Sequence, residues 1–266
     1  MKSNILKTIG TIITVLFLCC NLTGAQDTLY IYRSGAVVDK HAVAEIDSIT
    51  FYKNNPAIQS TVTDLDGNIY HTLRIGTQTW MVENLSVSKY RNGDLIPAIT
   101  NNSDWVVLTS GGYCWYNNDI ANKPIYGALY NWYTVADNRN IAPIGWHVAS
   151  DAELSVLTTY LGGESVAGDK MKETGTSHWI IPNSGATNES GFTGLPGGLR
   201  SYSSGAFLNM GTNGYYWSTT DSDTIRAWDR ELFHNQDNCF RYYFDSKHYG
   251  FSVRCVKDTV ILSNGL

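Results

Sequence analysis

The stretch from residue 175 to residue 216 constrains the fold of this chain more than any other feature. It is rich in Gly, Asn, Ser and Thr, and Pro182 and Pro196 interrupt it. Glycine and proline break regular elements, while Asn and Ser favour turns, so an irregular course is expected. An irregular segment of this length within a compact domain is usually functional or well packed. The sequence therefore predicts a domain with one long irregular loop region.

Short strands are expected on both sides of this loop region. Between residues 59 and 83, turns at Asp66-Gly67 and Gly76-Thr77 separate three runs of alternating residues. After the loop region, four runs rich in β-branched and aromatic residues are typical of strands, namely Tyr215–Thr220, Ile225–Leu232, Cys239–Phe244 and Gly250–Val256. Asp64 and Asp66 have part of the spacing of a calcium loop, but its remaining ligands are missing, so a tight turn is favoured.

The stretch GWHVASDAELSVLTTYLGG predicts a helix over residues 150–161. Ser150 and Glu153 have the Ser-x-x-Glu spacing of a capping box, and Asp151 adds a negative charge where the helix dipole is positive. Three leucines at helical spacing form the buried face, Leu154, Leu157 and Leu161. The carboxylates of Asp151 and Glu153 are thereby explained, because both stabilise the N-terminus of the helix. For His147, which precedes the cap, a packed and hydrogen-bonded role is favoured over a catalytic one.

Two further helices are expected. In YGALYNWYTV, residues Leu129, Trp132, Tyr133 and Ala136 follow the i, i+3, i+4, i+7 pattern, which predicts an amphipathic helix over residues 127–136. A short third helix is expected at Val166–Glu173. Helices and strands in this arrangement indicate an α+β fold.

The first 25 residues have the pattern of an export signal. Lys2 and Lys7 precede the apolar run Ile9–Cys20, and Thr23-Gly24-Ala25 supplies small residues before a cleavage point ahead of Gln26. We therefore expect a signal peptide over residues 1–25 and a secreted or outer cell-surface protein.

Two alternatives to this reading of the leader are less favoured. The apolar run is shorter than the roughly 20 residues that a membrane span needs. A lipid anchor at Cys20 needs a small residue just before it, and Leu18 and Cys19 fit poorly there. No other apolar run is long enough to cross a bilayer, so no integral span is expected after cleavage.

Residues 26–57 are expected to form a short N-terminal β unit and a linker. Leu29–Tyr32, Ala36–Val38 and Ser48–Lys53 have the composition of strands, and Asn54-Asn55-Pro56 is typical of a linker. The main domain is expected over residues 58–258, with residues 259–266 as a C-terminal tail.

The charge of the chain argues against nucleic acid as a partner. The formal charge is −5, and it becomes −7 when residues 1–25 are removed, because they hold two lysines and no acidic residue. Nucleic-acid binding requires a basic surface. The 24 glycines, 17 tyrosines and 8 tryptophans are instead typical of a loop-rich exported protein with many aromatic packing centres.

Three cysteines remain after cleavage, Cys114, Cys239 and Cys255. In an exported chain they allow one disulfide and one free thiol, and the spacing does not decide which two pair. Cys239 is the candidate for a reactive thiol, although a plain buried thiol is favoured.

The sequence holds no recognisable catalytic motif. The six histidines are scattered, and the G-x-S-x-G, P-loop and G-x-G-x-x-G motifs are absent. Carboxylates could still meet in space, for example Glu189 with Asp229 or Glu231, but nothing in the linear sequence selects them. We therefore expect no catalytic residue, no metal and no cofactor.

Binding is the alternative to catalysis. Aromatic residues with Asn, Glu and Arg nearby suit sugar rings or peptides, although each aromatic residue alone is more often part of a core. The candidate ligand contacts are Asn188, Glu189, Arg200, Trp217 and Arg230.

Several motifs together resemble one family. DLDGNIYHTLRIGTQTWMVENL, YGALYNWYTV, PIGWHVASDAEL, NSGATNESGFTGLPGGLR, GYYWSTT and GFSVRCVKD occur in the order seen in the Fibrobacter succinogenes major paralogous domain. The resemblance covers roughly residues 59–258. The preceding EIDSITFYK (Glu45–Lys53) resembles a β segment frequent at the start of exported Bacteroidetes proteins.

The resemblance implies a C-type lectin-like fold, related to that of formylglycine-generating enzymes. Such a fold has two main helices, small antiparallel sheets and a long irregular loop region that carries the ligand site. Family members often bridge the cysteine of the final strand to one before P-x-G-W-H, where this chain has Ala142, so the resemblance does not extend to that disulfide. The catalytic thiol pattern of the formylglycine-generating enzymes is not recognisable.

We therefore expect an exported, non-enzymatic binding or adhesion module whose partner is a glycan or a cell-surface protein. The alternatives are an oxidase-like enzyme that uses a cysteine and a purely structural component of the cell envelope.

Overall fold

The computed structural model describes residues 28–33, 36–42 and 60–259 of the 266-residue chain. The chain divides into two units, residues 1–52 and 53–266. In the first unit, β1 (Thr28–Arg33) and β2 (Ala36–Ala42) form an antiparallel pair that contains the first two predicted strands. The predicted signal peptide, the strand at Ser48–Lys53, the linker and most of the C-terminal tail lie outside the described residues.

The second unit contains two five-stranded sheets. In the first sheet, all neighbours are antiparallel and the order is β3-β4-β5-β14-β8. Its strands are β3 (Ser60–Thr63), β4 (Ile69–Ile75), β5 (Gln78–Met81), β14 (Cys255–Lys257) and β8 (Trp146–Val148). Asp64 closes the turn after β3, because its carboxylate accepts from the amides of Asp66 and Asn68, both at 2.9 Å. The predicted turn is confirmed.

The second sheet has the order β10-β9-β11-β12-β13. Its strands are β9 (Gly197–Arg200), β10 (Phe207–Met210), β11 (Asn213–Asp221), β12 (Arg226–Phe233) and β13 (Cys239–Ser246). Only the β9–β11 contact is parallel. Three of the four predicted late strands are thus confirmed as β11, β12 and β13, whereas Gly250–Val256 is regular only at its end.

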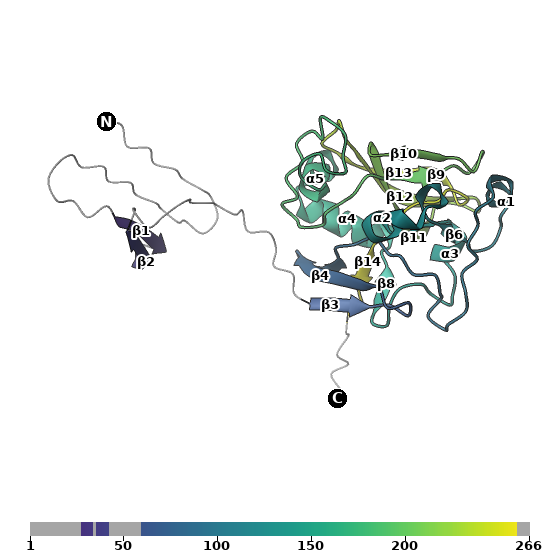
Figure 1. Ribbon diagram of the computed structural model, residues 1–266, viewed down its shortest axis with the longest axis horizontal. Helices are drawn as coiled ribbons and strands as arrows, with labels where there is room; N and C mark the ends of the chain where they lie inside the picture. Colours follow the sequence, from purple (N-terminus) through teal and green to yellow (C-terminus); the bar gives the residue numbers. More distant parts are fainter. Residues whose placement is uncertain (1–27, 34–35, 43–59, 260–266) are drawn as a thin grey trace. The chain divides into compact units, whose positions relative to one another are not determined.

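Helix α4 (Asp151–Tyr160) confirms the helix predicted from the capping box. The Ser150 amide donates to Glu153 Oε2 at 2.8 Å, and the Glu153 amide donates to Ser150 Oγ at 3.3 Å. Helix α5 (Glu164–Met171) follows, close to the predicted third helix. Figure 1 shows α4 between the two sheets of this unit. Its buried leucines share a core with Trp80 of β5 and Leu232 of β12, so α4 joins both sheets.

The helix predicted over residues 127–136 is wrong for most of its length. Residues Leu129–Tyr130 form β7 and pair with β6 (Tyr113–Cys114). Only one helical turn follows, α3 (Trp132–Val135), which Asn131 caps through a bond from the Thr134 amide. Backbone pairing with a distant segment has overridden the local apolar pattern.

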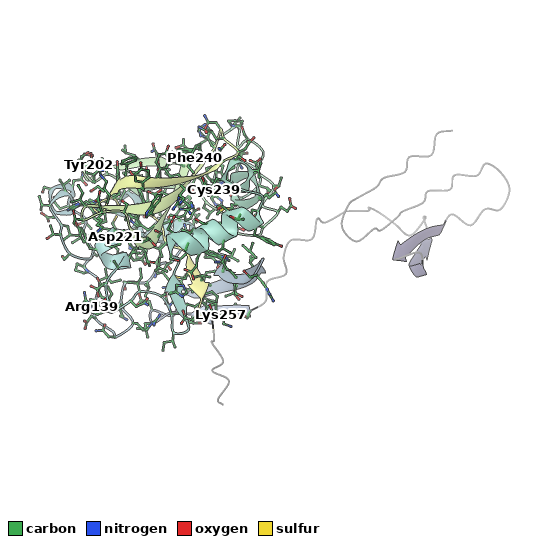
Figure 2. All side chains as sticks on the ribbon, turned by 180° about the vertical axis from the view of Figure 1, so that it is seen from behind. Arg139, Tyr202, Asp221, Cys239, Phe240 and Lys257 are labelled. Atoms are coloured by element: carbon green, nitrogen blue, oxygen red, sulfur yellow. The ribbon has the colours of Figure 1, made fainter. Side chains whose placement is uncertain are left out.

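The predicted loop region is well packed. It contains the short strands β9 and β10, and the buried Arg254 ties it to the rest of the unit. The Arg254 guanidinium donates to Phe192 O and Thr193 O in the loop and to Met81 O at the end of β5. Four short helices complete the unit, α1 (Asn102–Val106), η2 (Tyr116–Asn118), η3 (Ile120–Asn122) and α2 (Lys123–Tyr126). Figure 2 shows Tyr202 and Phe240 toward one border of the unit and Lys257 of β14 toward the other.

Candidate functional site

Strand β12 places two acidic residues on the same side of the sheet. Successive side chains of a strand point to opposite faces, so Ala227, Asp229 and Glu231 share one face. The register confirms this, because Asp229 lies opposite Trp217 of β11 and Glu231 opposite Tyr215. On the other face, Arg230 points toward α4, where it pairs with Asp151.

A register shift brings a third carboxylate to this face. Asp229 pairs with Tyr242 of β13, but Ala227 pairs with Asp245. Between these two pairs β13 therefore contains one more residue than β12. Such a bulge re-aims the side chains that follow it. Without the extra residue, Asp245 would point to the opposite face from Tyr242.

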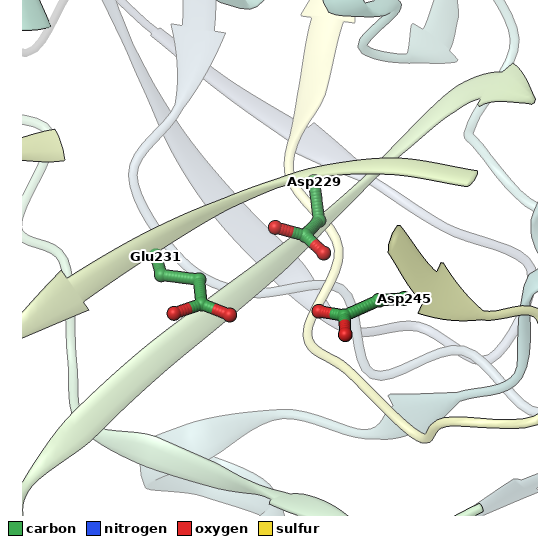
Figure 3. A group of neighbouring side chains, drawn as sticks. All are labelled: Asp229, Glu231 and Asp245. Atoms are coloured by element: carbon green, nitrogen blue, oxygen red, sulfur yellow. The ribbon is translucent and has the colours of Figure 1, made fainter. Parts of the chain in front are cut away.

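Figure 3 shows the three carboxylates of Asp229, Glu231 and Asp245 turned toward one another. One oxygen from each lies within 4.8 Å of the other two. We call these three residues the acidic triad. Among the described residues, they are the one group of this kind with the reach to hold a metal ion.

The triad is largely buried, and no described side chain compensates the charge of its carboxylates. Asp229 is fully buried and Glu231 is 8% exposed, whereas Asp245 is partly exposed. Neither carboxylate oxygen of Asp229 accepts a hydrogen bond from any described group. No ion pair among the described residues includes a member of the triad. Unpaired buried charge is strongly unfavourable, so the site is built to take up a proton, a cation or hydrogen-bond donors.

The pKa values reflect this environment. Burial, followed by the repulsion of Asp245, raises the pKa of Asp229 well above its usual range. The same two causes, in the same order, raise the pKa of Glu231 to about 8. Carboxyl groups this close share protons when nothing positive lies between them.

Tyrosine side chains surround the triad. Tyr215, opposite Glu231, accepts hydrogen bonds at its hydroxyl oxygen from the Asn209 and Asn213 amides, both at 2.8 Å. Its own hydroxyl proton is therefore free to be donated elsewhere. Tyr242, which pairs with Asp229, is 39% exposed. The triad face thus combines buried acceptors with an accessible aromatic ring.

A second pair of rings extends this face. Tyr249 lies 4.8 Å from Tyr202 and 5.1 Å from Phe251, measured between ring centroids. Burial first, and then the charge of Asp245, raise the pKa of Tyr249 to about 12. Phe251 also packs 4.3 Å from Trp217, which lies opposite Asp229, so these rings continue from the triad. Tyr202 is 44% exposed and presents its ring to solvent.

Three of the five candidate contacts predicted from the sequence lie in the interior. Trp217 is fully buried, packs 4.3 Å from Phe251 and donates its indole N–H to Tyr130 O at 3.0 Å. Arg200 is also fully buried, and its guanidinium donates to backbone carbonyls of residues 99–101. Arg230 binds Asp151 at 2.7 Å. A ligand cannot reach these side chains without local opening of the fold. Their contacts with other segments stabilise the fold instead.

The other two candidates, Asn188 and Glu189, are accessible. Asn188 holds the loop through two bonds with Thr193, from its amide to Oγ1 and from the Thr193 N–H to Oδ1, both at 2.9 Å. Glu189 lines a cavity of about 410 Å³ together with Arg74, Tyr160 and Lys170. The five candidates therefore do not converge on one site, and none belongs to the triad.

From the sequence, Asp229 and Glu231 were candidates to meet Glu189 in space, whereas Asp245 was not a candidate. The available signal was the Asp-x-Glu spacing within one predicted strand, which places two acids on one face. Asp245 has no such signal, because strict alternation from Tyr242 assigns it to the other face. Only the register shift brings it into the triad.

The three described cysteines do not form the disulfide that their number allows. Cys114, Cys239 and Cys255 are all free and buried. Burial raises the pKa of the Cys114 and Cys239 thiols to about 12 and that of Cys255 further. A thiol must lose its proton to react as a nucleophile, so this environment opposes catalysis by any of the three.

His147 has the structural role that its position before the helix indicates. Its Nε2 lies 2.8 Å from Glu153 Oε1, and its Nδ1 lies 2.6 Å from Asp258 Oδ1. The hydrogen bond to Glu153 is the main cause that raises the pKa of His147 to about 9. The histidine therefore acts as a cation that connects the start of α4 to the segment after β14.

The fold and the site define a strand-rich α+β domain with a buried cluster of carboxylates on one sheet. Within the described ranges, no helix has the length and apolarity needed to cross a membrane. The model of the Fibrobacter succinogenes major domain matches residues 73–257, and the chain belongs to this family. Neither the curated proteins nor the solved structures that were compared include a match to the chain.

Proposed function

We propose that this chain is an exported or cell-surface binding module that recognises a glycan through the face of the acidic triad. The observation that carries the proposal is the carboxylate cluster: the buried Asp229 accepts no hydrogen bond from the described protein groups, and Asp245 beside it is partly exposed, so Asp245 is the member that a ligand can reach. Sugar hydroxyls are donors, and carboxylates are the strongest acceptors that a protein offers them. The exposed rings of Tyr202 and Tyr242 supply flat apolar surfaces on which sugar rings stack.

The leader pattern in residues 1–25 supports export. We also propose that the domain has a C-type lectin-like fold. The mixed α+β architecture and the packed loop region agree with that fold. A surface protein that displays a similar hydroxyl-rich ligand is the second partner class.

Binding is favoured over catalysis at the triad. Glycoside hydrolysis places two carboxyl groups about 5 Å or more apart, on either side of the scissile bond. At the triad Asp229 is fully buried and Glu231 is 8% exposed, so only the partly exposed Asp245 is accessible and two carboxylates cannot lie on either side of a scissile bond. Oxidase-like chemistry would need a reactive thiol, and the three described cysteines are buried with raised pKa values.

A glycan array tests this proposal, with Tyr242→Ala and Tyr243→Ala as matched variants. The two residues are neighbours on β13 with similar exposure, but Tyr243 packs on Trp228 at the opposite face. We expect a glycan signal that Tyr242→Ala reduces at least tenfold and that Tyr243→Ala leaves intact. Equal loss in both variants, or no glycan signal from the folded protein, would contradict the proposal.

A further inference from the structure

We infer that the acidic triad of Asp229, Glu231 and Asp245 is a binding site for a divalent cation of the calcium class. The inference concerns the cation alone and holds whether or not the ligand is a glycan. It starts from geometry. Calcium binds oxygen at about 2.3–2.6 Å, so its ligand atoms lie on a sphere roughly 4.8 Å across. The three carboxylates offer oxygens that all lie within 4.8 Å of one another.

The negative charge of the triad has no counterion among the described residues. Both oxygens of Asp229 lack a hydrogen-bond donor among the described residues, although the side chain is fully buried. An oxygen of Asp245 and one of Glu231 each lie within 4.8 Å of one of its own, so like charges crowd this point. A cation bound between Asp229 and Asp245 explains why a buried carboxylate has no hydrogen-bond donor and lies beside a second carboxylate.

The cationic side chains near these strands bind other partners than the triad. Arg230 and Arg241 both bind Asp151, each at 2.7 Å, on the other face of the sheet. Lys247 donates to Asp223 O at 2.8 Å and lies over the Trp132 ring. None of these three forms an ion pair with the triad, so no cationic side chain of the described residues is paired with it.

The ligand set favours calcium over other ions. Three carboxylates are hard oxygen donors, which suit calcium and magnesium rather than zinc, whose sites use nitrogen and sulfur. Magnesium demands a near-ideal octahedron, whereas calcium accepts six to eight oxygens in irregular geometry. Asp245 is partly exposed, so the remaining positions open toward solvent, where water or ligand hydroxyls complete the coordination.

Isothermal titration of chelator-treated protein with calcium chloride tests the inference, with magnesium chloride in parallel. We expect one calcium per chain and weaker binding of magnesium. Glu231→Gln and Asp245→Asn keep the shape of each side chain but remove a charged ligand, and each should weaken calcium binding at least tenfold. Asp221→Asn is the matched control, because Asp221 is exposed at the end of β11, and it should bind calcium like the wild type.

Thermal unfolding provides a second measurement that does not depend on a binding signal. Calcium should raise the melting temperature of the wild type and of Asp221→Asn. Asp229→Asn removes the buried charge, so in chelator it should melt at or above the wild-type temperature and should gain nothing from calcium. Absence of calcium binding by the wild type at millimolar concentration, or equal binding by the triad variants, would overturn the inference. Calcium binding without any glycan signal would contradict only the proposed function.

Discussion

Asp245 pairs with Ala227 across the β12–β13 ladder, and this register carries its carboxylate to the face that holds Asp229. The neighbouring pair, Asp229 with Tyr242, shows that β13 gains one residue between the two positions. Strand β11 also departs from regular register here, because Trp217 pairs with Asp229 but Asp221 with Ala227. The triad therefore lies where the strands on both sides of β12 are irregular, and bulges of this kind are common beside functional sites.

The first prediction concerns Trp217. Because its side chain is fully buried against Phe251 and its N–H bonds Tyr130 O, Trp217→Ala should lower the free energy of unfolding by about 3–5 kcal/mol. Urea denaturation followed by circular dichroism measures this loss. Tyr242→Ala, at a partly exposed ring, should lose far less. A Trp217→Ala protein with wild-type stability and lost binding would instead make Trp217 a ligand contact.

The second prediction concerns the buried ion pair of Arg230 with Asp151. Arg230→Ala leaves Asp151 with Arg241 alone and should cost about 3–5 kcal/mol of stability, because one partner of a buried pair is removed. Arg226→Ala is the control, since Arg226 is 41% exposed and lies 3.8 Å from Asp223. It should cost less than about 1 kcal/mol. Similar losses in both variants would show that Arg230 is not held as a buried cation.

The third prediction concerns pH. The pKa of His147 rises from 6.5 to about 9 in the folded chain, mainly through its bond to Glu153. Its stabilising effect is therefore complete below about pH 6.5 and disappears as the pH rises through 9. The urea midpoint of the wild type should exceed that of His147→Gln at pH 6, and the two should converge near pH 10. A difference that grows with pH would contradict the ion-pair role.

The fourth prediction concerns the thiols. Cys114, Cys239 and Cys255 are buried with raised pKa values, so a thiol reagent at pH 8 should label none of them rapidly in the native protein. All three should react once the chain is unfolded in urea without a reductant. Rapid labelling of Cys239 in the native state would restore the thiol-enzyme alternative, and only one reactive thiol after unfolding would indicate a disulfide.

The sequence by itself determined those features whose causes are local. The capping box at Ser150 and Glu153 satisfies the first amides of α4 from within four residues, so the helix could be placed from its own sequence. The turns at Asp66-Gly67 and Gly76-Thr77 and the strands β11, β12 and β13 are local in the same sense. Together with the family motifs, they indicated the α+β class and the long loop region.

The tertiary structure decided everything that depends on contacts between distant segments. Residues 129–130 became a strand because residues 113–114 offered backbone partners, although their apolar pattern is helical. Trp217, Arg200 and Arg230 became interior because other segments cover them, which no property of a single residue reveals. The acidic triad formed because an extra residue in β13 turned Asp245 to the other face. Register is set by the pairing of whole strands, and a shift of one residue reverses the face of every side chain that follows.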